Sequence, residues 1–425
     1  MNGADTGACF DAVIIGAGPA GSAAATLLAR AGWAVALVEK QRFPRRKVCG
    51  ECIAASNLPL LEGLGLGGTL ARDAGPELRT VALMHGRHTV DAALPPAAGG
   101  RLAWGRALGR ETLDTLLVEQ ARHAGATVLQ PWAVRGMAGG AGNWRLELRC
   151  TRSPAARELQ APVAIAAHGS WEALPSARAQ RRGERGGADL LAFKANFAGA
   201  RLEPGCLPVL ALDGGYGGMV LADGGLLTLA CCVRRDRLDA LRARAPGRSA
   251  GAVVEDWLQR ECAGVARALQ GAQRAGAWLA SGPLDPGVRV RSDDGLLRIG
   301  NAAGEAHPIL GEGISMALQS AGLLCAELLA GGSGPARADA RAHAAWHAGV
   351  ARRYAAAWRR QFLPRLYLGA ALAHLAMRPA TAGLAVHLVR AWPGLLTRSA
   401  RWGGKVRCAA DPLAYGAGNA QGVAP

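Results

Sequence analysis

Lysine is scarce in this chain, and its scarcity changes how the net charge is interpreted. The formal net charge is +17, but lysine occurs only at positions 40, 47, 194 and 405, so nearly all the basic residues are arginine. A charge of this size suits nucleic acid or an anionic membrane. However, the arginines are scattered, and the few aromatic residues are not interleaved with them. The pattern therefore argues against nucleic-acid binding and favours an acidic small molecule or a lipid surface.

Long apolar runs are absent as well. The longest uncharged apolar stretch, LYLGAALAHLAM at 366–377, is far shorter than the ~20 residues that a membrane-spanning helix needs. The N-terminus has no basic region of the kind that opens a signal peptide. We therefore expect a cytoplasmic chain with reduced cysteines that does not cross a membrane, with peripheral contact to the inner membrane left open. Its 425 residues suffice for two or three domains.

A second CxxC motif is also missing. Cys49 and Cys52 form one CxxC in FPRRKVCGECIAAS (43–56), but no other CxxC or suitable cysteine–histidine spacing accompanies it. A structural zinc site needs such a second pair. We therefore predict no metal site.

The strongest positive signal is DAVIIGAGPAGSAAATLLARAGWAVALVEK at 11–40. A short buried strand, a glycine-rich turn, a helix of small residues and a second strand follow one another. Gly16 permits the tight turn, Gly18 allows a pyrophosphate to approach the backbone, and Gly21 lets helix and strand pack closely. Glu39, at the end of the second strand, accepts from a ribose hydroxyl and disfavours a 2′-phosphate. The pattern predicts FAD or NAD binding; the alternative is a glycine-rich turn that binds nothing.

A second strand–turn–helix pattern occurs late in the chain. The apolar LLRI precedes GNAAGEAHPILGEGISMA (300–317), which runs into an apolar helical stretch. A turn of small residues at a helix N-terminus is a geometry that holds an anionic group. Between the two patterns, the helix and strand at 106–134 are followed by a meander strand (143–150) and a buried strand (161–170). The dinucleotide-binding fold is thus interrupted and resumed.

This discontinuous layout resembles the glutathione-reductase-like FAD fold of the geranylgeranyl reductase and aromatic-ring hydroxylase superfamily, over roughly residues 10–330. The resemblance implies an α/β fold: an FAD-binding Rossmann domain with an inserted antiparallel β-sheet substrate domain and C-terminal helices. The predicted FAD-binding domain comprises residues 1–80, 101–170 and 286–335. The predicted substrate domain comprises residues 81–100 and 171–285. The C-terminal helical region comprises residues 336–425.

The resemblance also implies cofactor contacts. The residues predicted to bind the cofactor are Gly16, Gly18, Pro19, Ala20, Gly21, Glu39, Lys40, Arg46, Arg110, Val134, His168, Gly169, Gly300, Asn301, Pro308, Gly311, Gly313 and Ile314. Two of them depart from the family pattern, which has aspartate at both places. Asn301 keeps an oxygen that can accept from the ribityl chain, and His168 either lies near the cofactor or is a structural residue. The anion at the late turn is then the FAD pyrophosphate, with reduced flavin or a substrate oxygen as the second candidate.

KVCGE (47–51) resembles the Lys-x-Cys-Gly segment that lies beside the flavin ring in geranylgeranyl reductases. Lys47 and Cys49 are accordingly the predicted catalytic residues, with a small buried hydrophobe as the alternative role for Cys49. Short strands over 189–233 predict a sheet that roofs a substrate cavity, and Lys194 and the pair Cys231–Cys232 are candidates to face it. The helical region 336–408, rich in Arg and Trp, either packs on the FAD domain or lies on an anionic membrane.

These features predict an FAD-dependent oxidoreductase acting on a lipophilic small molecule. A monooxygenase that uses NAD(P)H and oxygen on an aromatic or polyketide-like substrate is favoured. The alternative is a reductase that delivers hydride to a C=C bond, with Cys49 as proton donor. The Trp-x-Trp-x-Ile-Pro segment of related halogenases is absent, which argues against halogenation. A non-catalytic FAD-binding partner is a third reading, and the sequence does not define an oligomeric state.

Overall fold

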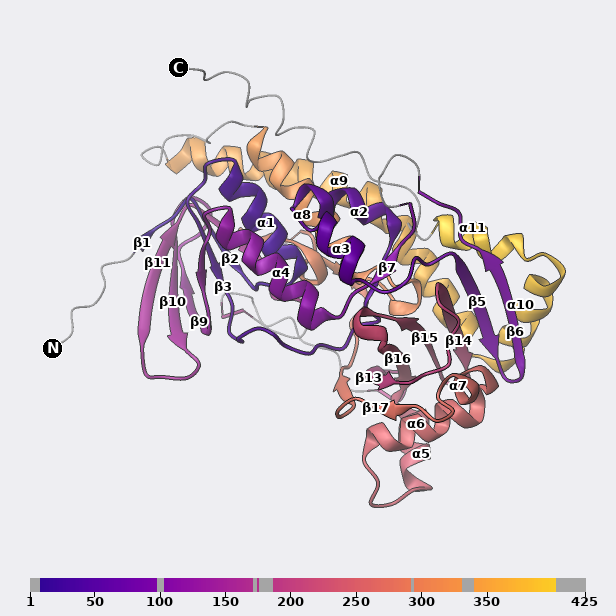
Figure 1. The fold of residues 1–425 in the computed structure, drawn as a ribbon. Coiled ribbons are helices and arrows are strands. Elements are labelled where there is room, and N and C mark those ends of the chain that lie inside the picture. Colours follow the sequence, from indigo (N-terminus) through magenta and orange to yellow (C-terminus); the bar gives the residue numbers. More distant parts are fainter. Residues whose placement is uncertain are drawn as a thin grey trace.

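The computed structural model describes residues 8–97, 103–170, 174–175, 186–291, 294–330 and 340–402. Figure 1 shows an elongated molecule in which one end carries a parallel sheet between helices and a small, mostly antiparallel sheet. The other end carries a second, larger sheet, and the C-terminal helices run along both parts.

The first domain is built on a five-stranded parallel sheet with the order β20-β12-β2-β3-β8. Its strands are β20 (Leu297–Arg298), β12 (Val163–Ala166), β2 (Ala12–Ile15), β3 (Val35–Val38) and β8 (Thr127–Leu129). On one face lie α1 (Pro19–Arg30), α4 (Arg110–His123) and α8 (Gly313–Leu329). On the other lies a four-stranded sheet of β1 (Ala8–Cys9), β11 (Ala156–Ala161), β10 (Trp144–Cys150) and β9 (Trp132–Ala138).

Alternation along the strands explains the three layers. In β2, Ile14 packs in the core shared with α1 and α8, whereas Val13 and Ile15 pack in the core shared with the four-stranded sheet. Both faces of this sheet are therefore covered, as is usual for parallel sheets, and the strands read as continuous apolar runs. The sequence prediction of an interrupted FAD-type α/β domain is confirmed.

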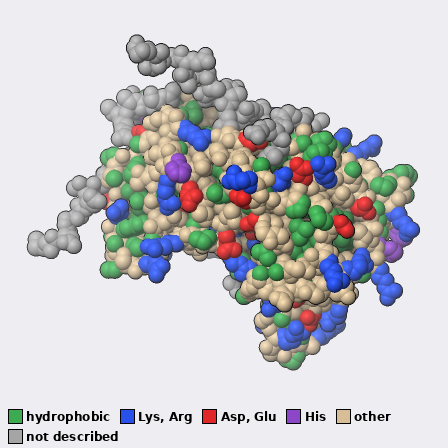
Figure 2. Space-filling view, in the orientation of Figure 1, with side chains coloured by type: hydrophobic (Ala, Val, Ile, Leu, Met, Phe, Trp, Pro, Cys, Tyr) green, Lys and Arg blue, Asp and Glu red, His purple; other side chains and the backbone are tan. Residues whose placement is uncertain are grey.

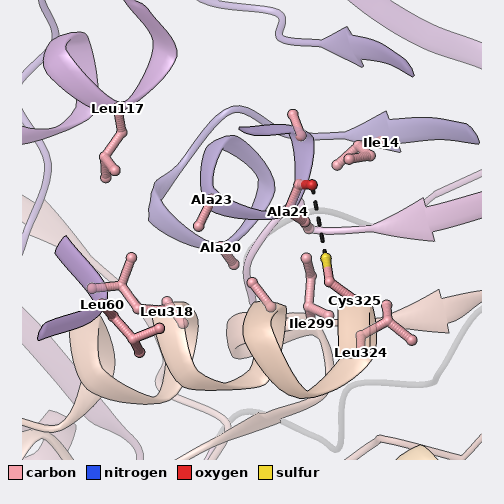
Figure 3. Close-up of a cluster of buried hydrophobic side chains, with 14 of the residues drawn as sticks. Ile14, Ala20, Ala23, Ala24, Leu60, Leu117, Ile299, Leu318, Leu324 and Cys325 are labelled. Atoms are coloured by element: carbon pink, nitrogen blue, oxygen red, sulfur yellow. Dashed lines mark hydrogen bonds between the residues drawn. The ribbon is translucent and has the colours of Figure 1, made fainter. Parts of the chain in front are cut away.

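Small residues bring α1 and α8 close together. Figure 3 shows Ala20, Ala23 and Ala24 of α1 facing Leu318 and Cys325 of α8, with the Cys325 thiol 3.8 Å from the Ala24 carbonyl oxygen. Side chains no larger than alanine allow the two helix axes to approach. This packing places the N-termini of both helices at the same edge of the parallel sheet, where the predicted cofactor residues lie.

The second domain contains an eight-stranded sheet with the order β17-β13-β16-β15-β14-β5-β6, with β18 also paired to β13. Its strands are β5 (Thr80–His85), β6 (His88–Ala93), β13 (Leu190–Ala198), β14 (Cys206–Leu212), β15 (Gly215–Leu221), β16 (Leu227–Arg234), β17 (Gln273–Arg274) and β18 (Leu279–Ser281). The predicted sheet was wholly antiparallel, but β5 and β14 pair in parallel. The reason is that β5 comes from a hairpin more than a hundred residues upstream, which joins the sheet edge.

Helices cover one face of this second sheet. They are α5 (Arg235–Ala243), α6 (Ala250–Glu261) and α7 (Ala263–Ala268). The sequence predicts a single helix over 250–270, whereas the structure breaks it at Cys262, whose backbone is extended (φ −135°, ψ 106°). The polar loop predicted at 176–188 lies mostly outside the described residues.

The C-terminal region is helical, as predicted. Helix α9 (Ala340–Ala376) packs on α8 through Val350, Tyr354 and Trp358. Helices α10 (Pro379–Ala391) and α11 (Gly394–Trp402) lie instead against the second sheet, where they contact β5 and β6. Within the described ranges, no helix is both long and apolar enough to span a bilayer. On the face in Figure 2, basic side chains are scattered over the surface.

The remaining elements are short and connect the larger ones. They are β4 (Cys52–Ile53) with β7 (Arg106–Ala107), β19 (Gly287–Val288) with β21 (Gly304–Glu305), α2 (Leu58–Gly63), α3 (Gly67–Asp73), and 3-10 turns at Ala55–Asn57, Asp223–Gly225, Gly300–Ala302 and Pro308–Leu310.

Candidate active site

The turn between β2 and α1 has the geometry predicted from its glycines. Gly16 has φ +106°, and a Cβ there would lie 2.6 Å from the Ala167 carbonyl oxygen. A Cβ at Gly21 would lie 1.8 Å from the Gly16 carbonyl oxygen. Both positions therefore require glycine for the turn itself. At Gly18 the nearest atoms to such a Cβ are guanidinium nitrogens of Arg110 and Arg45, at 3.9 and 4.0 Å. Gly18 thus borders a space flanked by two cations.

Glu39 holds this turn from the end of β3. Its buried carboxylate accepts hydrogen bonds from the backbone N–H groups of Ala17, at 3.0 Å, and Gln41, at 2.9 Å. The Arg45 guanidinium lies 3.6 Å from the same carboxylate. Glu39 therefore stabilises the turn directly and leaves acceptor capacity at the strand end, where a ribose hydroxyl would approach.

Positive charge converges beside Gly18. Arg110 forms a bidentate pair with Asp114 at 2.7 and 2.8 Å, and Arg45 lies 3.7 Å from the same carboxylate. Burial, followed by repulsion from Arg110 and Arg45, lowers the pKa of Lys47 to about 8. Three cations, Arg45, Arg110 and Lys47, thus lie beside two carboxylates, Glu39 and Asp114. The turn is therefore prepared for an anion.

His168 lies at the end of β12 in the same basic region. Burial, then the charges of Arg298, Lys47 and Arg289, lowers its pKa to about 4, so its ring is neutral at physiological pH. Its Nδ1 is buried without a hydrogen-bond partner. The next residue, Gly169, has φ +85°, and the Lys47 ammonium lies 3.6 Å from the place where its Cβ would be. An unpaired polar atom in a buried basic pocket fits a bound polar group.

Asn301 follows β20 and is engaged through its amide nitrogen. Nδ2 lies 3.1 Å from Ser170 Oγ and 3.5 Å from a carboxylate oxygen of Glu305. The oxygen Oδ1 is therefore the atom left to accept from a ligand. Glu305 is buried, and burial raises its pKa. An aspartate at position 301 would bring a second carboxylate next to Glu305, which gives a physical reason for the amide.

One cavity of about 420 Å³ joins these groups to the second domain. Of the sequence-predicted site residues, those that line it are Gly18, Pro19, Ala20, Lys47, Cys49, Arg110, Gly169, Gly300, Asn301, Pro308, Gly311, Gly313 and Ile314. Those that do not line it are Gly16, Gly21, Glu39, Lys40, Arg46, Val134 and His168. Of the second group, Gly16, Gly21 and Glu39 belong to or hold the turn that carries Gly18.

Three of those residues have surroundings of their own. Lys40 follows Glu39, and its carbonyl accepts from the Thr151 hydroxyl at 3.1 Å. Val134 lies within β9, paired with Leu148. Arg46 points toward the second domain, where it donates to Asn196 Oδ1 at 3.1 Å. The cofactor contacts predicted for these three residues stay predictions.

The far wall of the cavity is apolar. It is formed by β5, β13–β16 and the C-terminal helices, and includes Val81, Leu83, Phe193, Leu207, Val209, Met219, Leu372, Val389 and Leu396. Both cysteines of the pair Cys231–Cys232 line it, whereas Lys194 does not. A lining of this kind suits a lipophilic molecule.

A polar group interrupts the apolar wall at Tyr216. Burial, followed by the neighbouring Cys232, raises the pKa of Tyr216 well above its ordinary value, and burial raises that of Cys232 to about 12. Tyr216 Oη lies 3.3 Å from His307 Nδ1, and the His307 ring centroid is 6.1 Å from that of His374, which is exposed. Two protonated donors, the Tyr216 hydroxyl and the Cys232 thiol, thus lie at the cavity wall. The sequence offered only a glycine-flanked tyrosine as a signal for this group.

A buried network connects the two domains, and sequence reasoning did not find it. Glu51 is 2% exposed and accepts from Lys194 Nζ, from Thr228 Oγ1 at 2.5 Å and from the Arg110 backbone N–H at 2.8 Å. Glu51 has φ +57°, the one positive φ among the described residues other than glycine. Lys194 therefore neutralises Glu51 and fixes the second sheet against the turn that carries Arg110.

Cys49 lies on the cavity wall between these groups. Its sulfur accepts from the Glu51 backbone N–H at 3.3 Å and interacts with the Arg110 guanidinium. Cys52, the other half of the CxxC, is buried, and both are free thiols. Among the described residues, no group of three or more His, Cys, Asp or Glu side chains is arranged to hold a metal ion.

The residues present fit FAD. An open glycine cradle at Gly18 and cations that outnumber their carboxylate partners lie together at the cavity wall. That region supplies what a diphosphate needs, and the apolar cavity continues from it.

Comparisons with known proteins agree with this geometry. Residues 10–220 match the family described as an FAD binding domain. The menaquinone reductase of Mycobacterium tuberculosis is 36% identical over 119 residues, which are 28% of this chain and 28% of that protein. The chain spans less than two thirds of the curated relatives it matches: 64% for one from Dictyostelium discoideum and 28% for this reductase.

Two solved structures share the fold. The myxobacterial chondrochloren halogenase CndH superposes with a TM-score of 0.66 at 22% identity, covering 85% of this chain and 83% of that one. PqsL of Pseudomonas aeruginosa, titled a probable FAD-dependent monooxygenase, superposes with a TM-score of 0.65 at 19% identity, covering 89% of this chain and 100% of that one.

Residues 10–220 thus match an FAD binding domain, and the fold is the one that the halogenase and the probable monooxygenase share.

Proposed function

We propose that this protein is a monooxygenase that hydroxylates a lipophilic aromatic or polyketide-like molecule, with NAD(P)H as reductant and oxygen as co-substrate. The observation that carries the proposal is the single cavity that joins the cationic FAD cradle to an apolar wall. Bound, reduced FAD would supply either oxygen activation or hydride, and the protein would determine which substrate reaches it.

The chain's own residues perform the remaining tasks. Gly18, Arg45 and Arg110 hold the diphosphate, and Asn301 Oδ1 accepts from the ribityl chain. The apolar wall positions the substrate and excludes water, which hydroxylation requires more than it requires a protein nucleophile. The ion pair of Glu51 and Lys194 fixes the position of the apolar wall relative to the cradle. In this reading Cys49 contributes packing only.

Reduction of a C=C bond is the second candidate, and it is favoured by the acids in the cavity. The carbon that does not receive hydride must receive a proton, and general acid catalysis is typically worth about 10²–10⁴-fold. Cys49 is the donor predicted from the sequence, and Tyr216 is a protonated donor that the structure adds. The similarity to a menaquinone reductase supports a lipophilic quinone as the substrate class for this candidate.

Oxygen dependence separates the two chemistries. FAD-loaded protein is reduced, with NADH, NADPH and dithionite compared as reductants, and mixed with lipophilic quinones and phenols with or without isotopically labelled oxygen gas. Hydroxylation predicts a product that contains one labelled oxygen atom, no product without oxygen, and a Cys49→Ala variant that keeps most of its rate. An unlabelled product that gains two hydrogens anaerobically, with a large loss in Cys49→Ala or Tyr216→Phe, would replace hydroxylation by reduction. Turnover with dithionite, but with neither NADH nor NADPH, would leave the FAD assignment intact. It would overturn the proposal that NAD(P)H is the reductant.

A further inference from the structure

The outer faces of α10 and α11 expose large apolar side chains. Trp402, Trp392 and Leu384 are 76%, 64% and 59% exposed, and Leu388 is 41% exposed. Isolated exposed apolar residues are ordinary, but two short consecutive helices that carry several of them form a patch that needs a partner.

The opposite faces of the same helices are buried, so the exposed residues are not a sign of loose packing. Val386 and Val389 of α10 are buried against the second sheet, and α10 contacts β5, β6 and β14. The Thr397 hydroxyl of α11 donates to the Ala93 carbonyl at the end of β6 at 2.8 Å. The helices are therefore fixed with one apolar face inward and a second apolar face outward.

The charged side chains of the C-terminal helices themselves have one sign. Residues 340–402 contain no Asp or Glu and ten arginines: 341, 352, 353, 359, 360, 365, 378, 390, 398 and 401. The last four of these are exposed on or beside α10 and α11. Figure 2 shows basic side chains among apolar ones at the end of the molecule that carries these helices in Figure 1. Tryptophan and leucine bordered by arginine is the composition of a helix that lies in a membrane interface.

The cavity opens on this patch. Leu375 of α9 and Leu395 of α11 line the cavity and are also 45% and 38% exposed. Leu396, Ser399 and Ala400 of α11 continue the lining inward. The apolar wall that faces the FAD cradle is thus continuous with the exposed surface of the helices.

We propose that α10 and α11 lie on the surface of an anionic bilayer and that a membrane-dissolved substrate enters the cavity past Leu375 of α9 and Leu395 of α11 without passing through water. The entry of a lipophilic substrate rests on the proposed function, whereas bilayer binding does not. A second copy of the chain is the less suitable occupant, because a symmetric dimer would bring the same arginine-bearing face against itself. An anionic surface instead attracts each exposed arginine.

Vesicle flotation of the FAD-loaded protein tests the surface. The parent is expected to float with phosphatidylglycerol-containing vesicles, to bind pure phosphatidylcholine vesicles at least about tenfold more weakly, and to release as salt rises. Arg390→Glu with Arg398→Glu should weaken binding about tenfold or more. The matched control reverses Arg145 and Arg149, which are exposed on β10 at the other end of the molecule, and should bind nearly as the parent does.

Trp392→Ser with Trp402→Ser tests the apolar component and should reduce binding at every salt concentration. FAD absorbance and circular dichroism establish that each variant is folded. No binding by the parent, or equal losses in the two charge-reversal variants, would overturn the proposal. A dimer in light scattering that the tryptophan double variant abolishes, without vesicle binding, would assign the patch to a second copy instead.

Entry from the bilayer is tested separately with a turnover substrate. The tryptophan variant should lose turnover of a vesicle-borne quinone or phenol but keep that of the same molecule in detergent micelles. Equal loss in both media would refute entry from the bilayer. Absence of turnover in the parent in both media would count against the proposed function and leave the flotation result standing.

Discussion

Substitution of Gly18 should affect FAD binding and not stability, whereas substitution of Gly21 should affect stability. Gly18 has an ordinary extended conformation (φ −71°, ψ −176°), and a Cβ there meets nothing closer than 3.9 Å. Gly18→Val should therefore leave the apoprotein as stable as the parent. At Gly21, by contrast, a Cβ would lie 1.8 Å from the Gly16 carbonyl oxygen, which is deep inside contact distance.

The expected magnitudes follow from what each side chain displaces. The valine at position 18 occupies the space between the turn and the two guanidiniums, where a diphosphate would sit. Hydrogen bonds to charged groups are worth about 1.5–3 kcal/mol each, so losing two weakens FAD roughly 100-fold or more. Gly21→Ala must push β2 and α1 apart, and overpacking of this kind costs about 1–3 kcal/mol or more of the free energy of unfolding.

Flavin absorbance after gel filtration, FAD titration of the stripped protein, and urea unfolding of the apoproteins measure both effects. Gly18→Val should be colourless and stable; Gly21→Ala should be destabilised whether or not FAD is present. Gly18→Val that retains full flavin absorbance would sink the assignment of the turn as the diphosphate cradle. A Gly21→Ala apoprotein as stable as the parent would refute the packing argument.

Three further outcomes are expected. Asn301→Leu should weaken FAD binding by roughly 1–3 kcal/mol. Asn301→Asp should instead keep the acceptor and raise the pKa of Glu305 further. Equal FAD affinity in the Leu variant and the parent would place Asn301 away from the cofactor. Because FAD binding should stabilise protonated Lys47, the affinity for FAD should be constant below pH 8 and fall by up to about tenfold per pH unit above it. The Lys47→Met variant should show a flat pH profile. A parent profile that is equally flat would contradict this prediction. Lys194→Met should cost about 3–5 kcal/mol by leaving Glu51 buried and unpaired, and Lys194→Met with Glu51→Gln should cost less than the sum of the single changes; additivity in urea unfolding would refute the coupling.

The sequence predicts those parts of the site that are formed by residues close together along the chain. In the first turn, the strand, the glycines and the helix start lie within a dozen residues, so spacing alone shows that Gly16 and Gly21 are sterically required. The late turn after β20 was recognised for the same reason. Its glycines at 300 and 311 both have positive φ, +59° and +61°.

The parts that were missed join distant segments. Glu51 meets Lys194 across 143 residues, and Tyr216 meets His307 across 91. No periodicity marks such pairs, because each partner occupies a strand or loop whose local pattern is satisfied without the other. In β13 nearly every residue is buried, so alternation could not indicate whether Lys194 faces the cavity. Only the assembled sheet shows that it faces Glu51.

The two departures from the family pattern become intelligible together once the charges are in place. With Asn301 and a neutral His168, the cradle lacks two carboxylates that the resemblance leads one to expect, while Arg45, Arg110 and Lys47 remain. Glu305, which lies 3.5 Å from the Asn301 amide, returns one negative charge, but burial raises its pKa and so weakens that compensation. The surplus positive charge would favour a bound diphosphate, and with FAD bound it would also favour the reduced flavin more strongly than a cradle with both aspartates would. Restoring the carboxylates with Asn301→Asp and His168→Asp should therefore lower the flavin reduction potential, and an unchanged potential in the double variant would show that this charge balance does not reach the flavin ring.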